Sequence, residues 1–163
     1  MKYKIIMTMA MTLLCVISTL TYAADMPSTL SLETLSPQLA NKVAVASFED
    51  CTKRGYKVAS AVVGRDGNLL AFLRNPLSGP HVIEISQRKA YSAASLQAPT
   101  SAMKTRTDLN FAPGILLIVG GVPISVGGKF YGGVAVAGAD PEIDEKCALA
   151  GVKTIEEILE FGE

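Results

Sequence analysis

The chain has 163 residues, with 15 basic residues, 15 acidic residues and a single histidine, His81. Because the formal net charge is zero, there is no electrostatic reason to expect nucleic acid as a partner. The single histidine and the absence of a Cys-x-x-Cys pair exclude the common zinc sites. The motifs Gly-x-Ser-x-Gly and Gly-x-x-x-x-Gly-Lys-Ser/Thr are also absent, so conventional hydrolysis and nucleotide chemistry gain no support.

Residues 1–23 are typical of a secretory signal peptide. A cationic start leads into a short apolar run, and the sequence TYAAD then suits cleavage after Ala23. The run is too short for a membrane span of about 20 residues. Two leucines precede Cys15, where lipoprotein processing requires a small residue, so we expect no lipid anchor. The sequence therefore predicts an exported protein, periplasmic or extracellular, with residues 24–163 forming a single domain.

The first half of that domain reads as a helix followed by a hairpin. Ser36 is a suitable N-cap, Pro37 suits the first helical position, and Gly55 suits the end of the helix. Residues 58–63 and 69–73 are apolar runs on either side of the turn sequence GRDGN, which predicts two antiparallel strands.

The second half begins with a helix over residues 80–97, for which Ser78 or Gly79 is the expected cap. Residues 99–113 have no clear period and predict a long surface loop. Three further strands follow at ILLIV (115–119), VPISV (122–126) and FYGGVAVAG (130–138), and a last helix covers residues 141–160.

These elements predict an α+β fold. Short connections between consecutive strands imply a five-stranded antiparallel sheet, and the helices would cover it as a sandwich. The first turn of the last helix carries an acidic cluster, DPEIDE, which is either a cation site or the usual complement of a helix dipole; the second reading is favoured.

Cys51 and Cys147 are the two cysteines of the predicted mature domain. In an oxidising compartment an even pair favours a disulfide, and we predict this bond over two buried free thiols. Closing a loop of roughly 100 residues would stabilise the fold by up to about 4–5 kcal/mol in the chain-entropy model.

The stretch GPHVIEISQRKAYSAAS combines the lone imidazole with a basic pair and a run of small residues. Arg88 lies about two helical turns after His81 and so on much the same side, whereas Lys89 is rotated by about 100°. The small side chains would let another helix, a neighbouring subunit or a flat ligand approach the backbone. The alternative is a close-packed helix with a capping histidine and a solvated basic face.

Several of these pieces carry a resemblance to a known family. The runs VVGRDGNLLAFLR, GPHVIEISQRKAYSAAS and PTSAM, followed by GGVPI, GGVAVAG and DEKCA, resemble the GlcG/HbpS haem-binding family, which includes the carboxy-terminal module of PduO-type proteins. The likeness covers residues 30–159. The chain departs from the family at Gly64, where many relatives have an acidic residue, and at Leu96-Gln97, where an aromatic-glycine pair is frequent.

The resemblance implies a five-stranded profilin-like sandwich that assembles as a homo-oligomer. It also implies an exported haem-binding protein that degrades haem or protects against it, with a membrane sensor protein as a further partner. Haem needs apolar walls, an axial donor and cations for its propionates. His81 is the best metal ligand by chemistry, and the family motifs and the nearby cations complete the predicted cofactor site: His81, Arg88, Lys89, Tyr91, Thr100, Lys104 and Arg106.

The alternative function is a non-catalytic module that binds another small ligand, a corrinoid or an organic acid, or that acts with a membrane receptor. Its support is the run of small residues in the helix and the absence of a catalytic constellation. Whether the protein is an enzyme stays open at this point.

Overall fold

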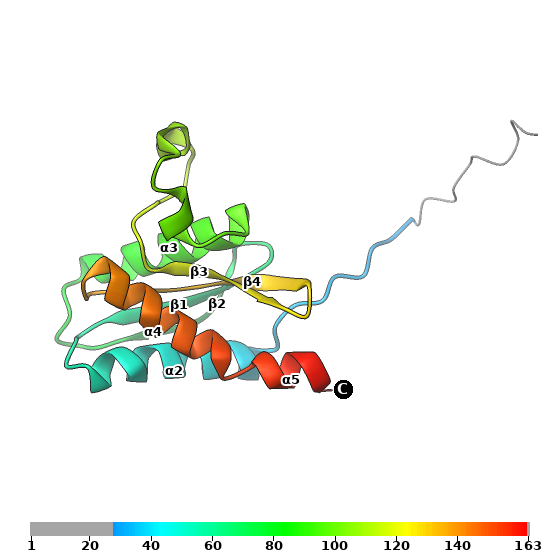
Figure 1. Ribbon diagram of the computed structural model, residues 1–163, viewed down its shortest axis with the longest axis horizontal. Coiled ribbons are helices and arrows are strands. Elements are labelled where there is room, and N and C mark those ends of the chain that lie inside the picture. The colour runs from blue at the N-terminus through cyan, green and yellow to red at the C-terminus, as the bar shows by residue number, and fades with distance from the viewer. Residues whose placement is uncertain (1–27, 163) are drawn as a thin grey trace, which may run out of the picture. The chain divides into compact units, whose positions relative to one another are not determined.

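A four-stranded antiparallel sheet is the centre of the computed structural model, which describes residues 28–162 (Figure 1). The strand order is β2-β1-β4-β3, so the two central strands are β1 and β4. The prediction of five strands is therefore wrong by one strand. The strands are β1 (Ala59–Gly64), β2 (Leu69–Arg74), β3 (Gly121–Val126) and β4 (Lys129–Ala137).

Helices cover both faces of this sheet, and the predicted α+β architecture is confirmed. Helices α2 (Pro37–Lys53) and α4 (Pro141–Lys153) pack on one face, and α3 (His81–Leu96) packs on the other (Figure 1). The short helix α5 (Glu156–Phe161) follows α4. From Glu33 onward the described chain forms one compact unit.

Alternation along the central strands supplies both layers of the core. Val62, Val134 and Val136 belong to the cluster beneath α2 and α4, whereas Ala61 and Ala135 belong to the cluster beneath α3. Successive side chains of a strand point to opposite faces. In these two strands the layer beneath α2 and α4 holds the three valines, whereas the layer beneath α3 holds the two alanines with one valine, Val63. The α3 side of the sheet is lined mainly by small residues.

Glycines in the sheet let α3 lie unusually close to it. A Cβ at Gly133 in β4 would meet the Ala90 carbonyl oxygen at 2.5 Å, and one at Gly121 in β3 would meet the Lys89 carbonyl oxygen at 2.5 Å. The small side chains of α3, predicted to admit another helix, a subunit or a ligand, therefore admit the protein's own sheet.

The strand predicted at residues 115–119 does not form. Its backbone groups bond to side chains of α3 instead of a neighbouring strand: the Leu116 N–H donates to Ser92 Oγ at 2.7 Å, and the Ile115 carbonyl accepts from Arg88 at 2.9 Å. Apolar composition alone suggested a buried strand, yet Ile118 is 45% exposed. The segment lies against α3 as irregular chain.

The predicted loop at residues 99–113 contains two short 3₁₀ helices, η1 (Thr100–Met103) and η2 (Thr107–Phe111). Figure 1 shows this segment, which we call the arm (residues 99–114), rising beyond α3 and away from the sheet. Phe111 near its end is 90% exposed.

Two helix ends differ from expectation, while one cap is confirmed. Ser36 caps α2, because its Oγ accepts from the Leu39 N–H at 3.3 Å. Pro80, not Ser78 or Gly79, occupies the N-cap position of α3 and provides no side-chain bond. The last predicted helix is divided at Thr154–Ile155 into α4 and α5.

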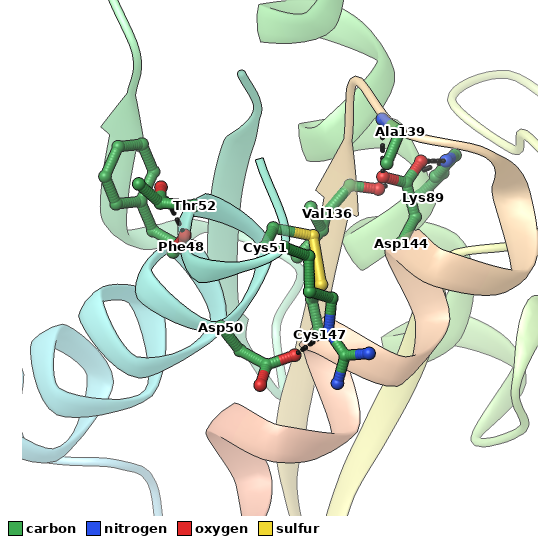
Figure 2. The surroundings of a disulfide bond; sticks show 10 residues. Phe48, Asp50, Cys51, Thr52, Lys89, Val136, Ala139, Asp144 and Cys147 are labelled. Atoms are coloured by element: carbon green, nitrogen blue, oxygen red, sulfur yellow. Dashed lines mark hydrogen bonds and ion pairs between the residues drawn. A yellow bond between two sulfur atoms is a disulfide. The ribbon is translucent and has the colours of Figure 1, made fainter. Parts of the chain in front are cut away.

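The predicted disulfide between Cys51 and Cys147 is present and joins α2 to α4 (Figure 2). The two Cα atoms are 5.5 Å apart, a common separation for a disulfide. The predicted signal peptide lies outside the described residues. Within residues 28–162, no helix has both the length and the apolar character to cross a membrane.

Candidate functional site

Helix α3 presents four of the seven predicted site residues to two separate pockets. His81 and Lys89 line one pocket, and Arg88 and Tyr91 line the other. We call them the histidine pocket and the arginine pocket. The structure therefore does not gather the seven predicted residues into a single site.

The histidine pocket has a volume of about 240 Å³ and lies between the start of α3, the end of β4 and the start of α4. His81 is exposed at its rim, as the first residue of α3. The imidazole ring lies over the backbone of Gly79: a Cβ there would be 2.7 Å from Nδ1 of the ring. The lining residues are His81, Val82, Ile85, Lys89, Ile118, Ala137, Gly138, Ala139, Pro141 and Asp144.

A buried ion pair forms the inner end of this pocket. Nζ of Lys89 lies 2.9 Å from Oδ2 of Asp144, and only 2% and 3% of the two side chains are exposed (Figure 2). Lys89 also donates to the Val136 carbonyl at 3.1 Å, and Asp144 accepts from the Ala139 N–H at 3.0 Å. These bonds connect α3 to β4 and α4.

Burial opposes the charge on both partners. It lowers the pKa of Lys89, against the attraction of Asp144, and it raises the pKa of Asp144, against the attraction of Lys89. Lys89 was predicted to bind a ligand carboxylate, but the structure gives it an internal carboxylate as partner. Its ammonium group holds the fold together at this point.

The arginine pocket has a volume of about 280 Å³ and lies between the β1–β2 turn, α3 and the base of the arm. Arg88 and Tyr91 face it from α3, and Gly67 and Gly114 border it from the turn and the arm. The full lining is Val63, Gly67, Asn68, Leu69, Gln87, Arg88, Tyr91 and Gly114.

The other three predicted residues belong to neither pocket. Thr100 is buried and ties η1 to β3, because its Oγ1 accepts from the Gly121 N–H at 3.1 Å. Lys104 lies on the arm, 3.5 Å from a carboxylate oxygen of Glu142, and Arg106 binds Asp108 at 2.9 Å. Both arm cations are exposed.

Sequence reasoning missed Asp144 as the partner of Lys89. The acidic cluster in which it lies was assigned to the helix dipole, and Asp144 is 55 positions from Lys89 in the sequence. Two residues that pair over such a distance leave no local pattern in the sequence. The one signal available for Asp144 was the position of its carboxylate on the apolar side of the last predicted helix. No group of three or more His, Cys, Asp or Glu side chains suited to a metal ion occurs among the residues that the structure describes.

The family comparison matches most of the described unit. The model of a family described as "Haem degrading protein HbpS-like" matches residues 35–153, from just before α2 to the end of α4. Protein GlcG of Escherichia coli K12 is 34% identical over 108 residues, which cover 63% of this chain and 81% of GlcG.

Solved structures show the same fold. A double mutant of HbpS from Streptomyces reticuli is 36% identical with a TM-score of 0.75, covering 82% of this chain and 94% of that one. The haem complex of PduOC is 18% identical with a TM-score of 0.68, covering 76% and 96%, and this likeness extends to the fold alone.

Proposed function

Because the chain belongs to the HbpS-like family, we propose that it binds haem, with His81 as an axial ligand of the iron. The observation that carries the proposal is the position of this imidazole: it is exposed at the rim of a pocket with apolar side chains beside it. Neutral imidazole is a common axial ligand of haem iron.

The histidine pocket fits part of what haem needs. Val82, Ile85 and Ile118 provide apolar surface next to the donor. The volume of about 240 Å³ lies below the roughly 300–1,000 Å³ of pockets that enclose a drug-sized ligand, so this chain would enclose a tetrapyrrole only in part. When bound, haem supplies a redox-active iron.

Lys89 is already paired, so the haem propionates need other cations. Arg88, Lys104 and Arg106 also have carboxylate partners, but these ion pairs are exposed and weak, so the three cations remain the candidates. Charge-assisted hydrogen bonds from these groups would orient the ligand.

Titration of the haem-free protein with haem tests the proposal. We expect a saturable shift of the Soret band, and His81→Ala should weaken binding or change the spectrum. Lys42→Ala, an exposed change on α2, is the matched control and should leave the titration unaltered. A His81→Ala spectrum identical to that of the wild type would exclude the assigned ligand.

Gly79→Ala gives a second test of the same ligand. The added methyl group would occupy the space of the imidazole ring and displace it. We expect an altered Soret band in the wild-type background and no further change in the His81→Ala background, where there is no ring to displace.

Degradation of bound haem is a finer proposal with its own test. Incubation of the haem complex with ascorbate and oxygen should bleach the Soret band and release iron faster than the same haem with His81→Ala protein. Equal bleaching with the two proteins would refute the proposed degradation without affecting the proposal of haem binding.

We also propose that the protein is exported, on the pattern of residues 1–23 and on the Cys51–Cys147 disulfide, a bond typical of oxidising compartments. Cell fractionation and the intact mass of the protein test this: the mature chain should begin at Ala24. A full-length cytoplasmic protein would refute it.

Self-association remains a prediction, which sedimentation analysis of the haem-free protein would test. A membrane sensor partner gains no support from the described residues.

A further inference from the structure

We propose that the arginine pocket is a subsite for an organic carboxylate, with the guanidinium group of Arg88 as its partner. This inference concerns a different pocket from the one that carries the proposed haem ligand. It therefore does not depend on iron coordination by His81.

The guanidinium of Arg88 is held in place but is not saturated. One terminal nitrogen donates to the Ile115 carbonyl at 2.9 Å, which fixes the group against the irregular segment beside α3. The other lies 3.4 Å from Glu84, whose side chain is 77% exposed, so this ion pair is weak. Nε is buried and has no acceptor.

That unpartnered nitrogen distinguishes Arg88 from other basic groups nearby. Lys89 is engaged by Asp144, and Arg106 is engaged by Asp108. Among the buried side-chain atoms of the described residues that lack a partner, Arg88 Nε is the one that carries positive charge. The Arg88 side chain is 40% exposed, and each terminal nitrogen carries two N–H groups of which only one is bonded. An incoming carboxylate can therefore accept charge-assisted hydrogen bonds from the terminal nitrogens.

Tyr91 provides a fixed wall beside this charge. A Cβ at Gly67 would be 2.7 Å from the ring, and one at Gly114 would be 3.1 Å from it. Both glycines have positive φ, +78° and +81°, so each position favours glycine for its backbone as well. The ring is clamped between the β1–β2 turn and the base of the arm.

The remaining lining limits the size and type of ligand. Val63 and Leu69 offer apolar surface, while Asn68 and Gln87 offer amides. A cavity of about 280 Å³ suits a small acid with a flat apolar body. The carboxylate belongs either to such a free acid or to a haem propionate, since the recognition chemistry is the same.

Benzoate is the probe for the haem-free protein, observed through the backbone amide signals of Gly67 and Gly114. We expect saturable shifts at these signals, and none with benzamide, its neutral isostere. Arg88→Gln should weaken benzoate binding by roughly tenfold or more, because it removes the charged donor. His81→Ala should leave the affinity unchanged within about twofold, because it lies on the other pocket.

Glu84→Gln provides a second test of the proposal that does not depend on the folding of the Arg88→Gln protein. It removes the competing carboxylate and leaves the bond to Ile115, so it should tighten benzoate binding by about two- to fivefold. The proposal is overturned if benzoate gives no saturable shift up to about 10 mM. It is equally overturned if benzamide binds the wild-type protein as well as benzoate does. The same holds if Arg88→Gln protein binds benzoate as tightly as the wild-type protein does.

Repeating the titration on haem-loaded protein identifies the source of the carboxylate. Loss of benzoate binding, together with weaker haem binding by Arg88→Gln, assigns the subsite to a propionate. Simultaneous binding assigns it to a free acid. Because the first titration contains no haem, failure of haem binding and failure of the carboxylate subsite are separate results.

Discussion

Lys89 and Asp144 form a buried pair whose members stabilise the fold only together. Both side chains are almost fully buried, and their bonds reach β4 and the start of α4. Removing one partner would leave an uncompensated charge in a low-dielectric interior, which costs about 3–5 kcal/mol. Replacing both by apolar groups costs far less.

We therefore predict strong coupling between the two positions. Lys89→Met and Asp144→Leu should each lower the free energy of unfolding by about 3–5 kcal/mol, and the double variant should lose much less than their sum. Urea denaturation of the four proteins measures the cycle. Additive losses would mean that the pair has no specific interaction.

The same pair predicts how stability depends on pH. Because burial raises the pKa of Asp144, the stability that this group contributes at low pH is lost as pH rises through its raised pKa. Because burial lowers the pKa of Lys89, the stability that it contributes above its ordinary pKa of 10.5 is lost as pH falls through the lowered pKa.

The quantity to follow is the unfolding free energy of the wild type minus that of the Lys89→Met/Asp144→Leu protein. As pH increases, this difference should decrease across the acid range, where Asp144 loses its proton, and increase across the alkaline range, where Lys89 loses its proton. Urea midpoints measured across pH test this. A difference that is constant with pH would contradict the pKa directions of both groups.

At the scale of elements, the predictions succeeded where a short local sequence determines the structure, as in a turn or a helix cap. The Asp66-Gly67 turn and its flanking apolar runs correctly predict the β1–β2 hairpin, and Ser36 correctly predicts the start of α2. The strand prediction for residues 115–119 was wrong, because two side chains of α3, Arg88 and Ser92, bond to backbone groups that a neighbouring strand would have to bond. No periodicity in the segment itself contains that information.

The close packing of α3 on β4 predicts a large effect for a small substitution. In Gly133→Ala, the new methyl group would meet the Ala90 carbonyl oxygen, and α3 would have to move. We expect a loss of about 1–3 kcal/mol in unfolding free energy by urea denaturation.

Gly64→Ala is the matched control, because its methyl group would meet Oδ1 of the exposed Asp66 side chain, and moving that carboxylate breaks only its exposed hydrogen bonds from Asn68. The control should cost much less than Gly133→Ala. Equal losses would show that the distance between helix and strand is not the cause.

At the scale of the whole molecule, the sequence identified the residue types of the site but not their grouping. His81 and Arg88 are predicted on much the same side of one helix, yet they line different pockets, because Ile118 and Asp144 border one and Gly67 and Gly114 the other. These neighbours come from distant parts of the chain. Local spacing cannot predict such neighbours, whereas the family motifs indicated the helix on which both pockets lie.

The disulfide is predicted to contribute much of the stability of the molecule. Cys51 and Cys147 are 96 positions apart, and closing so long a loop restricts the unfolded chain by up to about 4–5 kcal/mol. Cys51→Ala/Cys147→Ala protein should lose stability of this order in urea denaturation. Dithiothreitol should destabilise the wild type and leave the double variant unchanged; an effect on both would point to another cause.

The span of that disulfide also sets an order of events during synthesis. Every strand of the described sheet, helix α3 and the arm lie between the two cysteines. Cys51 is synthesised 96 residues before Cys147, and until Cys147 is added its thiol can pair only with other thiols. Nascent chains that stop short of Cys147 lack the partner altogether, so the bond between Cys51 and Cys147 marks a chain whose synthesis has reached α4.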